Sequence, residues 1–265
     1  MPGPWDQEYV LGRPHRALAG LVLRYQGYRE FSSTALRRRQ PPAGSCTLIL
    51  GLGPPLRLFG PAGPTAPTSF LAGMHDAAVI TEFTGAQHGL QVDLTPLGTY
   101  TLLGRPMPEL TNRVPRLDEL DAPALAGLPE RLAAEPDWPR RFARLDAALL
   151  TILDAARRRP DPEVGWAWRE LARTAGAVGV ARLAEETGWS RRHLLTRFRT
   201  QVGLAPKVAG RVLRFQRAAG LLVAGTGGTI ADVAATCGYA DHAHLDREFR
   251  ALAGCTPSAF LAELS

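Results

Sequence analysis

The sequence predicts an α+β protein with a β-rich amino-terminal domain and an all-α carboxyl-terminal domain. Three patterns support this class: short apolar runs between Gly/Pro clusters in roughly the first hundred residues, apolar spacing of three and four residues in the middle, and an internal repeat in the last third. A chain of 265 residues is long enough for two domains of ordinary size.

The amino-terminal domain, residues 1–160, begins with a pattern typical of a small sheet, sandwich or barrel, with a cupin-like fold among the options. Gly/Pro clusters at 40–44 and 60–64 predict turns between the strands. The basic run at 37–39 is expected to be a solvated loop. The predicted strands cover 18–28, 46–50, 56–59, 78–83 and 90–94.

A helical segment is predicted over 117–158, with a break at Pro136 and Pro139. Its apolar stripes could pair two copies of the chain, or they could pack on the chain's own sheet. Residues 157–162 carry no periodicity and end in proline, which is typical of an exposed linker, so the domain boundary is expected near residue 160.

Composition narrows the class of protein and its partners. The net charge is +6, and 178–265 contains eleven Lys or Arg against seven Asp or Glu, a local charge of +4 that suits a polyanion. Three cysteines without a Cys-x-x-Cys pair argue against a disulfide framework and a structural zinc, and no cofactor is expected. We find no apolar run of membrane-spanning length and no signal peptide, which predicts a cytoplasmic protein without a membrane partner.

The last third contains a near-repeat, offset by 50 residues up to a glycine–aromatic pair and by 51 after it. The second copy therefore has one extra residue within or just after the turn. The repeated positions are Leu183-Ala184, Gly188-Trp189, Leu194, Phe198-Arg199, Gly203 and Pro206 in the first copy, and Val233-Ala234, Gly238-Tyr239, Leu245, Phe249-Arg250, Gly254 and Pro257 in the second.

Each copy predicts a helix, a tight turn and a second helix. Gly188 and Gly238 can end the first helix of each pair, and Ser190 and Asp241 can cap the second. Thr229, with an aspartate three residues later, forms a capping-box pattern. The predicted carboxyl-terminal domain, 178–265, thus has helix-turn-helix units at 180–203 and 229–254, joined by a helix over 206–223.

This pattern resembles the DNA-binding domain of the AraC/XylS family of transcription regulators. The motifs that carry the resemblance are Ile230-Ala231-x-Val233-Ala234, Gly238-Tyr239, His244-Leu245, Phe249-Arg250, Gly254-Cys255-Thr256-Pro257 and Phe260. Ala205 departs from the family, where a capping Ser or Thr is common. More loosely, motifs at 95–98, 102–104 and 136–142 resemble the β-rich sensor halves of such regulators.

The resemblance implies a sequence-specific regulator that binds double-stranded DNA, with a small-molecule effector, a second copy of the chain and RNA polymerase as candidate partners. Arginine suits guanine edges, and histidine can donate to a base or a phosphate. A solvated helix face is the alternative for these residues. The DNA-binding residues that we predict are Arg191, Arg192, Thr196, Arg199, His242, His244 and Arg247.

Enzyme and metal chemistry have little support in the sequence. No nucleophile elbow, P-loop or metal motif is found, so no catalytic residue is assigned and the chain is not expected to be an enzyme. His242 and His244 do not share a helix face and are not expected to bind a metal together. His75, Glu82, His88 and Gln91 could line a pocket or lie scattered, which leaves the effector site unassigned. An effector-independent or architectural DNA-binding protein is the alternative function.

Overall fold

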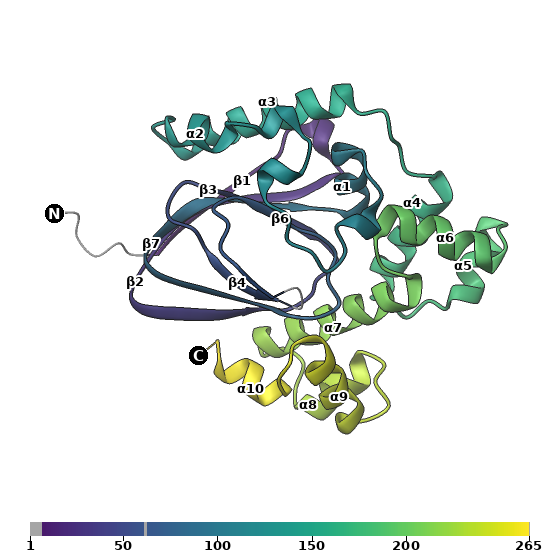
Figure 1. Ribbon diagram of the computed structural model, residues 1–265. Coiled ribbons are helices and arrows are strands. Elements are labelled where there is room, and N and C mark those ends of the chain that lie inside the picture. Colours follow the sequence, from purple (N-terminus) through teal and green to yellow (C-terminus); the bar gives the residue numbers. More distant parts are fainter. Residues whose placement is uncertain (1–6, 61–62, 265) are drawn as a thin grey trace.

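The computed structural model describes residues 7–60 and 63–264, and a β-rich part is followed by a helical part (Figure 1). The predicted α+β class is confirmed. The strands are β1 (Glu8–Gly12), β2 (Val22–Gln40), β3 (Cys46–Gly51), β4 (Arg57–Gly60), β5 (Gly63–Thr65), β6 (Phe70–Ala72) and β7 (Val79–Leu94). The α-helices are α1 (Pro96–Leu103), α2 (Leu128–Ala133), α3 (Trp138–Ala155), α4 (Pro162–Arg173), α5 (Val180–Thr187), α6 (Arg191–Val202), α7 (Pro206–Ala224), α8 (Ile230–Thr236), α9 (His242–Leu252) and α10 (Pro257–Ala262).

The sheet is antiparallel and is built around β7. Along its length β7 pairs with β2, and on its other side it pairs with β4 near its start and with β3 near its end. Strand β1 extends the sheet beyond β2, while β6 pairs with β3 and β5 with β4. Because side chains alternate between the faces of a strand, every element of this sheet contributes residues to two different surfaces.

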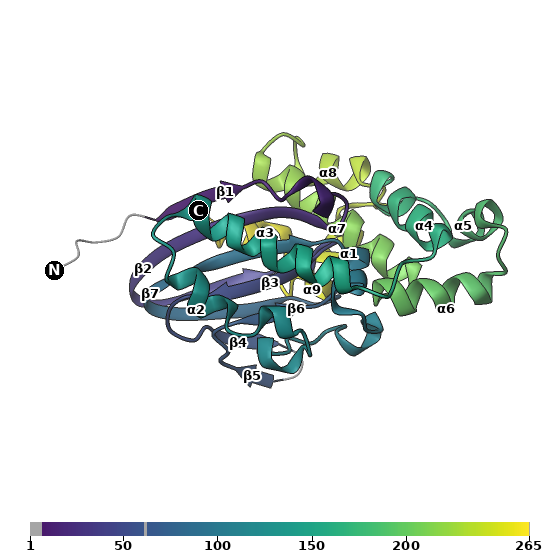
Figure 2. The same ribbon diagram turned by 90° about the horizontal axis from the view of Figure 1, so that it is seen from above.

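Helices α2 and α3 cover the outer face of the sheet, as the view from above shows (Figure 2), and α1 lies at the end of the sheet, packed against α3 and α6. The ring of Phe142 stacks on Tyr25 of β2 at 6.0 Å and on Trp138 at 6.2 Å between ring centroids. The Tyr25 hydroxyl donates to Asp146 at 2.9 Å. The apolar stripe of α3 is therefore used within the chain, the second of the two packing alternatives that the sequence left open.

The sheet differs from the prediction in three respects. The runs 78–83 and 90–94 are parts of one strand, β7, and the short strands β1, β5 and β6 were not predicted. The solvated loop expected at 37–39 is wrong, because these residues continue β2 after a shift of register between Ser32 and Leu36. Each arginine of the run pairs with a carboxylate: Arg37 with Glu82, Arg38 with Glu30 and Arg39 with Glu263.

The helical part begins earlier than the repeat indicated. Helix α4, in a segment that the sequence assigned to neither domain, packs against α5, α6 and α7. A Cβ added to Gly176, after α4, would stand 2.0 Å from the Gly210 carbonyl oxygen of α7, and one added to Gly210 would stand 3.2 Å from the Gly176 carbonyl oxygen, so the two backbones approach closely at this point. The domain boundary near residue 160 stays a prediction. Within the residues described, no helix combines the length and apolar character needed to cross a membrane.

Candidate DNA interface and ligand cavity

The two copies of the repeat fold into matching helix-turn-helix units. Helix α5 ends at Gly188, whose φ of 68° is the left-handed conformation that glycine adopts without strain, and Gly238 takes a φ of 75° after α8. The Ser190 side chain caps α6 and the Asp241 side chain caps α9. The extra residue of the second copy is Ala240, which lies between the turn and this cap.

Buried aromatic residues hold the second helix of each unit on the rest of the domain. Phe198 of α6 is fully buried against Trp168 of α4, at 6.4 Å between ring centroids. Phe249 of α9 is equally buried, 4.7 Å from Phe215 of α7 and 5.8 Å from Phe260 of α10. Helix α7 also contacts α6 of the first unit and both α8 and α9 of the second, and the opposite faces of α6 and α9 are exposed.

The exposed face of α6 carries four of the predicted DNA-binding residues: Arg191, Arg192, Thr196 and Arg199. The three arginines have no ion-pair partner among the residues that the structure describes. Arg191 and Arg192 lie in the first turn, where the positive end of the helix dipole disfavours a cation. An anionic partner, such as a DNA phosphate, would offset this unfavourable placement.

On helix α9, two of the three predicted DNA-binding side chains already have partners within the chain. His242 and Arg247 are exposed, and the Nε2 atom of His242 lies 3.3 Å from the Asp246 carboxylate. His244 is half-buried: its Nδ1 accepts from the Ala240 amide at 3.3 Å, and its ring meets Tyr239 edge-on at 5.3 Å. The equivalent pair in the first unit, Trp189 and His193, has the same edge-on geometry at 4.5 Å. These aromatic residues pack at the helix junctions, and His244 shares in that packing.

One acidic side chain outside the predicted set ties the linker to the first unit. The Asp161 carboxylate accepts from Arg197 at 2.6 and 2.8 Å and from the buried Gln201 at 2.6 Å. The hydrogen bonds from Arg197 have the largest effect, and together with the one from Gln201 they hold the pKa of Asp161 below its usual value. The carboxylate therefore stabilises the fold when it is ionised.

Asp161→Ala is expected to lower the free energy of unfolding by about 1–2 kcal/mol at pH 7, since the substitution leaves Gln201 and Arg197 without their partner. Because the folded pKa lies below the unfolded one, this contribution is complete above about pH 5 and is lost as the pH falls below about 4. Urea denaturation at several pH values checks both statements. Asp118→Ala, which removes an exposed carboxylate paired with Arg116, is the control and should have little effect.

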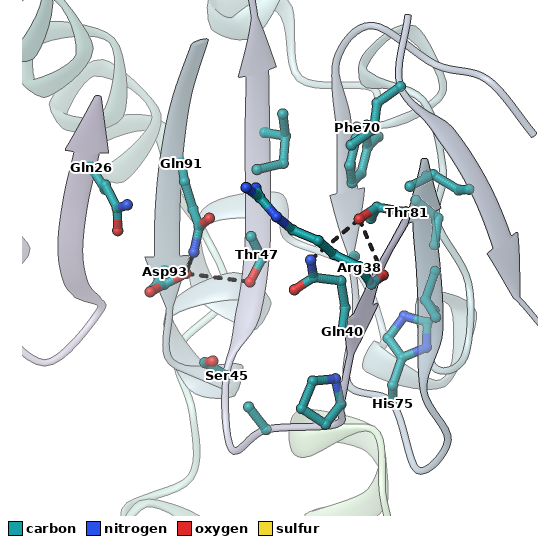
Figure 3. Close-up of a pocket in the computed structure, with 18 of the residues that line it drawn as sticks. Gln26, Arg38, Gln40, Ser45, Thr47, Phe70, His75, Thr81, Gln91 and Asp93 are labelled. Carbon is teal, nitrogen blue, oxygen red and sulfur yellow. Dashed lines mark hydrogen bonds between the residues drawn. The ribbon is translucent and has the colours of Figure 1, made fainter. Parts of the chain in front are cut away.

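The inner face of the sheet surrounds a cavity of about 610 Å³. Figure 3 shows polar side chains along neighbouring strands on one side and Phe70 and His75 on the other. Of the four residues considered for a pocket from the sequence, the structure brings together His75 and Gln91, whereas Glu82 and His88 lie outside the lining. The polar lining residues are Tyr9, Arg24, Gln26, Tyr28, Glu30, Arg38, Gln40, Ser45, Thr47, His75, Thr81, Gln87, Gln91, Asp93 and Gln216.

A signal for this cavity is present in the sequence. Arg24, Gln26, Tyr28 and Glu30 alternate along β2 on the cavity side, while Tyr25 between them packs on α3. Strand β7 repeats the pattern with Gln87, Gln91 and Asp93. Polar residues at every second position, opposite an apolar face that is itself buried, indicate a lined interior.

The helical part reaches the mouth of the cavity. Gln216 of α7 is among the lining residues, and its Oε1 accepts from the Gly44 amide in the turn before β3 at 2.8 Å. A second contact joins Arg39 of β2 to the ends of α9 and α10, where its guanidinium donates to both Glu263 oxygens at 2.9 Å and to the Ala253 carbonyl at 2.7 Å. The cavity and the second helix-turn-helix unit are thus linked through α7 and the end of β2.

Known proteins share both the local motif and the overall fold. A family model described as a helix-turn-helix domain matches residues 183–263. A structure of ToxT from Vibrio cholerae bound to (E)-4-(8-methylnaphthalen-1-yl)but-3-enoic acid is 11% identical, with 91% of this chain and 99% of that chain covered and a TM-score of 0.54. Unsaturated fatty acid bound ToxT is 10% identical, with 98% and 97% covered and a TM-score of 0.51. No curated protein sequence matches the chain. At these identities the ToxT structures establish a common fold.

Proposed function

We propose that this chain binds specific DNA sequences and responds to a small molecule. The premise is that residues 183–263 are the AraC-type helix-turn-helix domain of a transcription regulator. Family and fold point to a regulator and not to an enzyme. Helices α6 and α9 would enter two successive major grooves on one face of the duplex. The observation that carries this proposal is the pair of exposed, capped helices held by α7.

The response to a small molecule rests on the cavity inside the sheet. Its volume of about 610 Å³ suits a drug-sized ligand. The ToxT structures that hold a bound acid have the same fold, which supports a ligand-binding role for the amino-terminal part. A ligand at the mouth would meet Gln216 and would therefore bias how α7 and the second unit sit on the sheet.

The assigned residues divide by role. Arg192, Thr196, His242, His244 and Arg247 are proposed to contact bases or nearby phosphates, with His244 limited to its one free ring nitrogen. Arg191 and Arg199 are proposed to contact phosphates. RNA polymerase and a second copy of the chain remain proposed partners, and since the stripe of α3 packs on the sheet, a dimer would need another surface. A cytoplasmic location follows from this function.

Duplex binding tests the proposal, with a site selected from genomic fragments and a scrambled duplex for comparison. The logarithm of the binding constant should fall with the logarithm of salt concentration by about 0.9 per phosphate contact, since bound counterions are released. Chemical protection should cover two major-groove segments on one face, about 10 base pairs apart. Equal affinity for the selected and scrambled duplexes would instead indicate an architectural protein, and protection of one groove would exclude insertion of both helices.

A further inference from the structure

An unpartnered histidine lies at the apolar end of the cavity. His75, in the loop between β6 and β7, is 7% exposed, and neither ring nitrogen has a hydrogen-bond partner among the described residues. The Arg113 backbone lies nearby without the geometry of a hydrogen bond. Burial lowers the pKa of His75, so the ring is neutral at pH 7 and offers one donor and one acceptor. A buried polar group without a partner is costly unless a ligand satisfies it.

The charged groups of the cavity are already neutralised by one another. Arg24 bonds Asp93 at 2.6 Å, and Arg38 bonds Glu30 at 2.5 Å. The Tyr9 hydroxyl also donates to Glu30. These four ionised groups are the charged side chains of the lining, and their charges cancel. An ionised ligand would either bring an uncompensated charge into the cavity or break an existing pair, and both are unfavourable.

The remaining lining residues provide hydrogen bonds at one end and apolar contact at the other. The Gln26 side chain points into the cavity in Figure 3, and the Gln40 amide reaches Thr81 at 3.3 Å. The apolar part of the lining is a small core cluster of Ile49, Leu58, Phe70 and Val79, with Leu56 and Val114 packed on it. The ligand that fits this distribution has an apolar body and uncharged polar groups.

We infer that the cavity takes an uncharged amphiphilic molecule whose amide or hydroxyl group hydrogen-bonds to His75. This inference rests on the proposed ligand-binding role of the amino-terminal part and specifies the chemical class. The apolar body of the ligand packs against Phe70 and Leu58, and a second polar group reaches the glutamines. His75 acts as the residue that selects for hydrogen-bonding groups without charge.

The test uses the full chain and three probes on one carbon skeleton: phenylbutanamide, phenylbutanoate and phenylbutylammonium, with the phenylhexyl series as a longer set. Calorimetric titration should show the amide binding at least tenfold more tightly than either ion. His75→Leu removes both ring nitrogens and should weaken amide binding at least tenfold. His75→Gln keeps a donor and an acceptor and should retain most of the binding. His88→Leu, outside the lining, is the matched control and should bind as the wild type does.

Each result decides the inference. Equal or tighter binding of either ion overturns the uncharged class, and absence of binding by both amides overturns the site. Unchanged amide affinity in His75→Leu overturns the role of His75. If His75→Leu has a lowered melting temperature without probe, the role of His75 is decided by whether His75→Gln keeps both the wild-type melting temperature and most of the amide affinity. Duplex binding by the same samples separates the two proposals: intact DNA binding without amide binding counts against this inference alone, whereas amide binding without DNA binding counts against the regulator.

Discussion

Phe198→Ala is expected to lower the free energy of unfolding of the helical part by about 3–5 kcal/mol, because it removes a fully buried aromatic ring. The ring packs on Trp168, and it lies on the face of α6 opposite the predicted DNA contacts. Its loss leaves a cavity between α4 and α6 that the capped helix cannot close without moving its own exposed face. Binding to every duplex should weaken alike, since the reading helix loses its support and no base contact is removed.

Chemical denaturation followed by tryptophan fluorescence, to which Trp168 contributes, and by circular dichroism measures this loss. Leu195→Ala is the matched control, because Leu195 lies on the same helix and is 39% exposed, so its truncation should cost far less. A loss below about 1 kcal/mol for Phe198→Ala would mean that α6 is held mainly by other contacts, such as the Asp161 pairs.

The helical part could be predicted from the sequence because its determinants are local. Ser190, Asp241 and the capping box of Thr229 act within three residues of their own helices, and the observed caps agree with each. The internal repeat predicted that there are two helix-turn-helix units of the same architecture. Ala205 caps α7 without a side-chain hydrogen bond, as its chemistry requires.

The sheet and its cavity could be predicted only in part because their determinants are distant in the chain. Strand β7 runs through Gly85, whose φ of 80° interrupts the apolar pattern without ending the strand. The arginines at 37–39 stay in β2 because Glu82, Glu30 and Glu263 neutralise them, and no local pattern reveals those partners. The cavity likewise combines residues of β1, β2, β3, β4, β6 and β7 and of the loops between them with one residue of α7. Tertiary pairing overrides local propensity here.

Arg192→Ala is expected to cost about 1–3 kcal/mol in binding to the specific site and to relax the preference at one base pair, if the guanidinium bonds a base edge. Folding should be spared. Arg192 is exposed, and replacing a cation in the first turn of α6 removes an unfavourable interaction with the helix dipole. The change thus differs in kind from Phe198→Ala: recognition is lost while stability is kept.

Competition binding with duplexes that carry single base-pair substitutions, together with thermal melts, measures both properties of Arg192→Ala. Arg116→Ala is the control for charge, because it removes an exposed arginine from the amino-terminal part, where it pairs with Asp118. If Arg192→Ala weakens specific and scrambled duplexes equally, the arginine contacts a phosphate, since phosphates carry no sequence information directly. Early melting would instead show that the first turn of α6 depends on Arg192 for its structure. Only a loss confined to one base pair, with an unchanged melting temperature, assigns Arg192 to base reading.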